Sequence, residues 1–84
     1  MAFRQRGEGA LALEQFDELQ KQHPDYTAGY QMAAQMLTAD GKLPEAEQRL
    51  QAGIAAARRT GNRHAMAEME GMLDEIRNEI QERI

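Results

Sequence analysis

The chain has 84 residues and a formal net charge of −4, which makes it one small acidic domain, residues 1–84. It contains no cysteine and no serine, so disulfide frameworks, thiolate metal sites and the commonest catalytic nucleophiles are excluded. The longest apolar run, Ala52 to Ala57, is far too short to cross a membrane, and a negative surface repels the phosphates of nucleic acids. We therefore predict a soluble, cytoplasmic protein that binds neither membranes nor nucleic acid.

Helix-forming residues dominate the sequence, and no stretch alternates between apolar and polar residues as a strand would. The predicted fold class is therefore all-α.

The first predicted segment, residues 1–24, contains a helix end, a turn and one amphipathic helix. Residues 1–6 are interpreted as the last part of a helix, Gly7 as the residue that closes a turn, and Glu8 to His23 as the next helix. Pro24 ends that helix because the residue before a proline is disfavoured in the α region. The residues predicted to face inward are Ala12, Leu13, Phe16 and Leu19.

Residues 25–59 are predicted to form two antiparallel helices joined by a tight turn. Asp25 or Thr27 is expected to cap the first helix. Gly41 supplies the backbone freedom for the turn, and Pro44 suits the first turn of the second helix. The apolar stripes are Tyr30, Ala33, Ala34 and Leu37 in the first helix and Ala46, Leu50, Gly53, Ile54 and Ala57 in the second.

The last segment, residues 60–84, begins with a helix stop at Gly61 and a capping asparagine, Asn62. A helix from about Arg63 to Arg83 follows, with acidic outer faces. One narrow apolar seam runs along it through Met66, Met69, Leu73, Ile76, Ile80 and Ile84. We expect this helix to cap the C-terminal end of the fold and its last two turns to project beyond the body.

The hairpin resembles a tetratricopeptide repeat, in which an aromatic residue, small residues, a turn glycine and an alanine recur at fixed positions. A shift of 34 residues pairs Gly7 with Gly41 and Ala12 with Ala46. Arg58 stands where the repeat usually has a proline, so the second helix is expected to run on past its usual stop. The resemblance implies an α-solenoid of helical hairpins: a partial repeat (1–24), a full repeat (25–59) and a capping helix (60–84).

The resemblance also implies a non-catalytic module that binds a peptide or a partner protein on its concave face. The residues at the matching positions of the first hairpin helix are Ala28, Gln31, Gln35 and Thr38. The glutamines can hydrogen-bond a peptide backbone, or they can simply be solvated. Lysines and asparagines that would clamp a terminal carboxylate are missing from these positions.

The alternative function is self-assembly, because the apolar face of Glu8 to His23 lacks a complete partner helix on its N-terminal side. Either the chain belongs to a longer repeat protein, or a second copy covers the face. The residues predicted to carry such contacts are Leu13, Phe16 and Leu19, or Ile76, Ile80 and Ile84.

Little in the sequence indicates catalysis or a cofactor. His23 and His64 lack metal-ligand spacing, and no glycine-rich phosphate loop is present. The doublet Arg58 and Arg59 could bind an anion, but such a pair more often interacts favourably with the negative C-terminal end of its own helix. Several methionines fall on two helices expected to be neighbours, where they fill the core or line an adaptable surface. They are Met32, Met36, Met66, Met69 and Met72.

Overall fold

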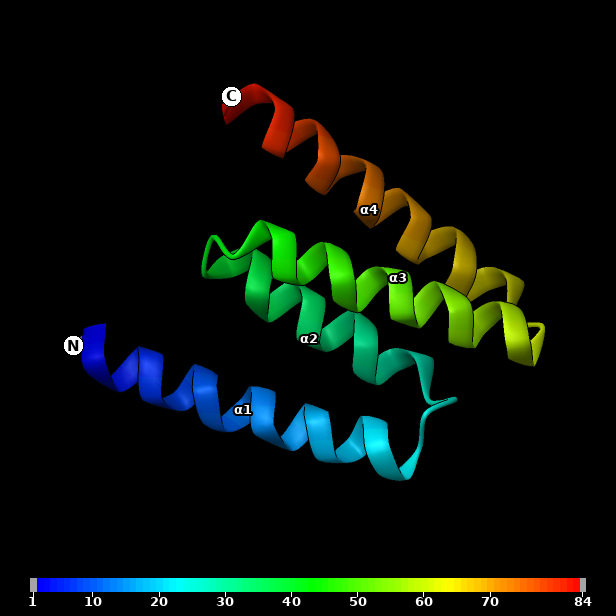
Figure 1. The fold of residues 1–84 in the computed structure, drawn as a ribbon, viewed down its shortest axis with the longest axis horizontal. Helices are drawn as coiled ribbons and strands as arrows, with labels where there is room; N and C mark the ends of the chain where they lie inside the picture. The colour runs from blue at the N-terminus through cyan, green and yellow to red at the C-terminus, as the bar shows by residue number, and fades with distance from the viewer. Residues whose placement is uncertain (1, 84) are drawn as a thin grey trace.

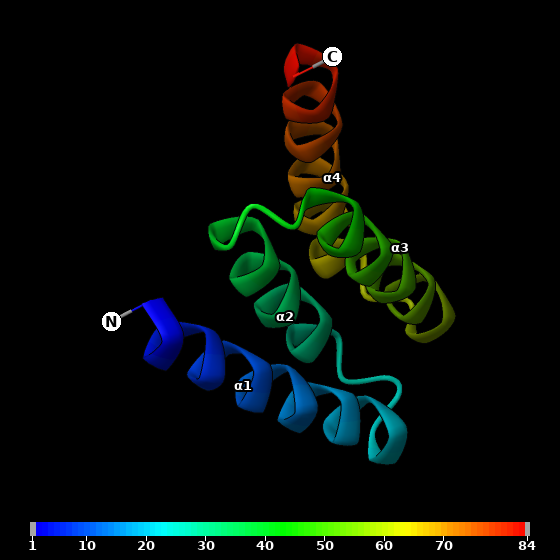
Figure 2. The same ribbon diagram turned by 60° about the vertical axis from the view of Figure 1, so that its left-hand side comes forward.

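The structure is a computed structural model that describes residues 2–83, and these residues form four helices joined by short turns. The helices are α1 (Ala2–Gln22), α2 (Thr27–Ala39), α3 (Leu43–Thr60) and α4 (Arg63–Arg83). Successive helices run in opposite directions, and α2 lies between α1 and α4 in both views (Figures 1 and 2). The all-α prediction is confirmed.

The core lies among α2, α3 and α4. Tyr30 and Leu37 of α2 and Leu50 of α3 are buried together with Met69 and Leu73 of α4. α1 packs its backbone against α2 only, and no side chain between Leu11 and Gln22 is fully buried. The molecule therefore has a well-packed three-helix part and a more loosely held first helix.

The two turns around the hairpin confirm the glycine predictions. Gly41 adopts a φ of 77° between α2 and α3, and Gly61 a φ of 73° at the end of α3. Both values lie in the left-handed region that favours glycine. Asn62 caps α4 as expected, since its side-chain oxygen accepts a hydrogen bond from the Ala65 backbone N–H at 3.1 Å.

The prediction of a turn at Gly7 is wrong, because α1 continues through it from Ala2 to Gln22. An interior glycine disfavours a helix by only about 1 kcal/mol relative to alanine, so good helix formers on both sides can carry the helix through. The part of the repeat alignment that places a turn at Gly7 is therefore not supported. Pro24 does end α1 in the predicted place.

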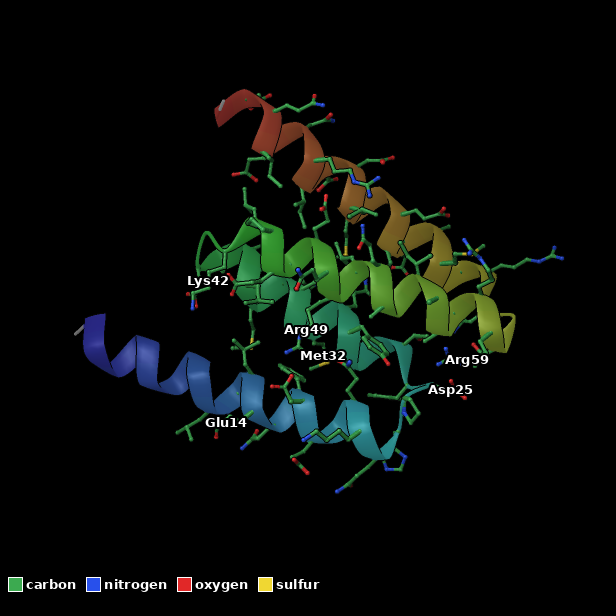
Figure 3. All side chains as sticks on the ribbon, in the orientation of Figure 1. Glu14, Asp25, Met32, Lys42, Arg49 and Arg59 are labelled. Atoms are coloured by element: carbon green, nitrogen blue, oxygen red, sulfur yellow. The ribbon has the colours of Figure 1, made fainter. Side chains whose placement is uncertain are left out.

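The predicted cap of α2 is also wrong. Tyr26 occupies the N-cap position without a side-chain cap, and Thr27 is the first helical residue. The Asp25 carboxylate instead accepts hydrogen bonds from Arg59 at 2.9 Å (Nε) and 2.6 Å (Nη2), and Figure 3 shows the two side chains facing each other. The Tyr30 hydroxyl donates to the Pro24 carbonyl at 2.7 Å. These contacts hold the α1–α2 loop against α2 and α3.

Two further ion pairs tie the outer helices to α3. Arg49 of α3 pairs with Asp17 of α1 and donates to the Gln20 side chain at 2.9 Å. Arg77 of α4 pairs with Glu47 at 3.0 Å. Pairs that are partly exposed to solvent contribute about 0–1 kcal/mol each, so they orient α1 and α4 more than they stabilise them.

Candidate functional site

The predicted concave-face residues lie on α2, and three of them lie beside α4, namely Gln31, Gln35 and Thr38. α2 contains no charged residue, and its inward side is occupied by Tyr30, Ala34 and Leu37. The remaining positions carry amide, hydroxyl, thioether and methyl groups or are glycine. Because these groups are neutral, a peptide that contacts this side of α2 avoids the much larger cost of desolvating a charge, provided that the amides keep hydrogen-bond partners.

α2 and α4 together form a small hollow of about 150 Å³. Gln35 and Thr38 line it from α2, and Met72, Glu75 and Ile76 line it from α4. Most of the exposed lining is apolar, with one amide, one hydroxyl and one carboxylate beside it. The hollow therefore suits a single apolar side chain of a partner, with polar groups at its rim to orient the chain that carries it.

The four predicted binding residues differ in their exposure and in whether their polar groups are already hydrogen-bonded. Gln35 is exposed, and its amide has no hydrogen-bond partner among the described side chains. Gln31 is half-buried and donates to the Met72 sulfur at 3.6 Å, while the Thr38 hydroxyl donates to the Ala34 carbonyl at 2.8 Å. Ala28 is half-buried and does not line the hollow. Gln35 is therefore the predicted residue best placed to contact a partner.

The α4 wall of the hollow was missed by sequence reasoning, although its signal is present. Glu68, Met72, Glu75 and Glu79 follow one another at spacings of 4, 3 and 4, which places them on one side of the helix. The Glu68 carboxylate lies 2.8 Å from Nε2 of His64. Glu75 is exposed and has no ion pair among the described residues. By helical spacing, the side of α4 that carries Glu75 is thus acidic.

The methionines divide between the two roles that the sequence left open. Met69 is fully buried and fills the core, and Met66 and Met72 pack against its edge. Met36 is half-buried, whereas Met32 is 48% exposed. Met72 alone among them both packs on the core and lines the hollow.

α1 presents a second surface, and its predicted self-association residues are only partly covered. Leu13 packs against the core, and Leu19 lies close to Gly29 of α2, but both remain half-buried, as does Phe16. Leu11, two residues before Leu13 and therefore on the opposite side of the helix, is 61% exposed. A wide hollow of about 570 Å³ lies at the end of this helix, lined by Leu19, Gln22, His23, Pro24, Asp25 and Tyr26.

The other predicted self-association surface, the seam of α4, is largely used within the chain. Ile76 is buried at 3% exposure, and Ile80 packs against the same core. The prediction that the turn containing Ile80 projects freely is therefore wrong, because the seam continues onto the core of α2 and α3. Ile84 lies outside the described residues.

The arginine doublet at the end of α3 does not form a joint anion site. Arg59 is held by Asp25, as described above. Arg58 lines a separate cleft of about 360 Å³ between α3 and α4, together with Glu70, Asp74 and Arg77. Charges of both signs in that cleft leave no net attraction for an anion.

No group of three or more histidine, aspartate or glutamate side chains within the described part of the chain could hold a metal ion. Among residues 2–83, no helix combines the length and apolar character needed to traverse a bilayer. Comparison with protein-family models, curated proteins and solved structures finds no match to this chain. The arrangement on α2 and α4 consists of an apolar hollow, the exposed amide of Gln35 and the carboxylate of Glu75 at its rim.

Proposed function

We propose that the chain is a non-catalytic protein-binding module that holds a partner segment in the hollow between α2 and α4. The observation that carries this proposal is that Gln35, Met72 and Ile76 line one hollow that is open to solvent. The amide of Gln35 has no hydrogen-bond partner among the described side chains. An apolar recess flanked by a few polar groups is the usual form of a site that binds one anchoring side chain.

The proposed architecture is a tetratricopeptide-like helical repeat, and the burial pattern supports it. A shift of 36 residues carries Ala33 to Met69 and Leu37 to Leu73, and all four residues are buried. The equivalent positions of α2 and α4 thus face the core in the same way. In such an arrangement the sides of α2 and α4 that share the hollow belong to one concave face.

We further propose that α4 caps the fold. The same shift carries Ala34, which packs in the core, to Glu70 in the outer α3–α4 cleft. Arg77 lies in the same cleft and is paired with Glu47. A charged surface at the place where a following helix would pack is what a terminal helix of a repeat array requires.

Replacing Gln35 with arginine tests the binding proposal. The bulky cation is expected to fill the mouth of the hollow, so capture of partners from lysate should fall at least about tenfold, or about 1.4 kcal/mol. Thermal unfolding should change little, because the side chain is exposed. Capture is measured by quantitative mass spectrometry on immobilised protein.

Gln48→Arg is the matched control, since Gln48 is an exposed glutamine of α3 outside the hollow. It makes the same change in charge and size. Capture of the same partners in equal amounts by both variants would contradict the proposed binding face.

Self-assembly through α1 is the second candidate, and the absence of any fully buried side chain from Leu11 to Gln22 favours it. If a second copy covers the face of Leu13, Phe16 and Leu19, Phe16→Glu should lower the solution mass measured by light scattering at the same protein concentration. Leu11→Glu is the matched control, because Leu11 is exposed and lies two residues from Leu13, on the opposite side of the helix. It adds the same charge and should affect the mass less. A monomer at every concentration would exclude this candidate.

A further inference from the structure

We infer that the segment held between α2 and α4 is cationic and amphipathic, with an apolar side chain in the hollow and lysine or arginine residues facing α4. This inference rests on the proposed function and specifies the chemistry of the partner.

The charge of the hollow comes from one helix only. α2 carries no charged residue along its whole length. On α4 Glu75 and Met72 line the hollow, and the spacing of Glu68 and Glu79 places them on the same side of that helix. A partner that enters the hollow from between α2 and α4 therefore meets the neutral side chains of α2 on one side and the Glu75 carboxylate on the other. Complementary charge on the partner would favour binding and set its orientation.

The carboxylate best placed to meet a cation is Glu75. It lines the hollow, it is exposed, and no described arginine, lysine or histidine pairs with it. The arginine nearest to it in the sequence, Arg77, is engaged with Glu47 of α3. Glu68 already has His64 as a neighbour. A lysine or arginine of a partner could therefore form an ion pair with Glu75, which has no such pair within the described residues.

The hollow also sets the size of the apolar anchor. A volume of about 150 Å³ accommodates one side chain and not a helix face. Met72 lines it with a flexible thioether, which adapts to anchors of different shape. The expected partner motif is therefore one apolar residue with basic residues beside it, rather than a long hydrophobic stripe.

Two fluorescently labelled peptides of equal length test the inference, one of leucine, alanine and lysine and the other of leucine, alanine and glutamate. Fluorescence anisotropy is expected to show at least about tenfold tighter binding of the lysine peptide. Glu75→Gln should weaken that binding about threefold, as expected for one partly exposed ion pair, and added salt should reduce the difference.

Glu70→Gln is the matched control, because Glu70 is an exposed glutamate of α4 that lines the outer cleft instead of the hollow. It removes the same charge and should change the affinity of the lysine peptide less than Glu75→Gln does. Equal effects of the two variants, tighter binding of the glutamate peptide, or no binding of the lysine peptide would overturn the inference.

The same titrations separate the inference from the binding proposal on which it rests. If Gln35→Arg weakens binding of the glutamate peptide while Gln48→Arg does not, the hollow is a binding site and only the preference for a cation fails. If the lysine peptide binds equally to the Gln35→Arg and Gln48→Arg variants, binding occurs elsewhere and both proposals fail.

Discussion

Leu50→Ala is expected to lower the free energy of unfolding by about 3–4 kcal/mol. Leu50 has no exposed surface and lies in the core formed by α2, α3 and α4. The substitution removes buried methyl groups and leaves a cavity that the neighbouring helices can close only in part. A single core of this size supplies about 3–5 kcal/mol of net stability, so the variant should be largely unfolded at moderate temperature. Urea unfolding followed by circular dichroism measures the change.

Leu11→Ala serves as the matched control for Leu50→Ala. The side chain of Leu11 is 61% exposed, so the same truncation should change the free energy of unfolding by less than about 0.5 kcal/mol. Similar losses for the two variants would show that α1 is part of the cooperative core, in contradiction to the packing described above.

Gly53→Ala is expected to destabilise the protein by about 2 kcal/mol, although alanine is the better helix former. A Cβ at Gly53 would lie 2.5 Å from the Met69 sulfur and 2.8 Å from Tyr30 Cβ. The sulfur belongs to a fully buried side chain, and Tyr30 Cβ cannot move without the backbone of α2. Both α2 and α4 would have to shift away from α3. Thermal and urea unfolding of the variant measure the loss.

Gly71→Ala should have the opposite effect. Gly71 lies in the interior of α4, and nothing lies within 4 Å of the position that its Cβ would take. The gain in helix propensity is therefore unopposed and should raise the free energy of unfolding by about 0.5–1 kcal/mol. A stabilising effect at both glycines would mean that α3 does not approach α2 and α4 as closely as the structure shows.

The helix boundaries that were predicted well are those with strong local signals. Gly61 and Asn62 terminate α3 and cap α4, and Pro24 terminates α1. Gly7 carried a weaker signal, because glycine alone, without a proline or a capping residue, can be tolerated inside a helix. The prediction that Asp25 caps α2 failed for another reason. Its carboxylate accepts hydrogen bonds from Arg59, a residue distant in sequence, and not from a local backbone N–H.

Sequence analysis identified the α2 wall of the candidate site but not its α4 wall. The outward-facing side of α2, including Gln35 and Thr38, follows from helical periodicity. Once Tyr30 and Leu37 are assigned to the core, the period of 3.6 residues places Gln35 and Thr38 away from it. Periodicity within α4 likewise shows that Met72 and Glu75 share a side of that helix. It does not show that this side lies next to Gln35.

The sequence by itself determined the all-helical fold, the turns at Gly41 and Gly61 and the apolar stripes that α2, α3 and α4 bury, because these depend on residues within a few positions of one another. Only the tertiary structure decided that Ile76 and Ile80 pack onto the core, that Glu75 meets the neutral side of α2 in one hollow, and that Gly53 has no room for a methyl group. Those features depend on how closely and in which register α2, α3 and α4 pack. Helix packing is set by the fit of side chains from all three helices together, and no local pattern records that fit.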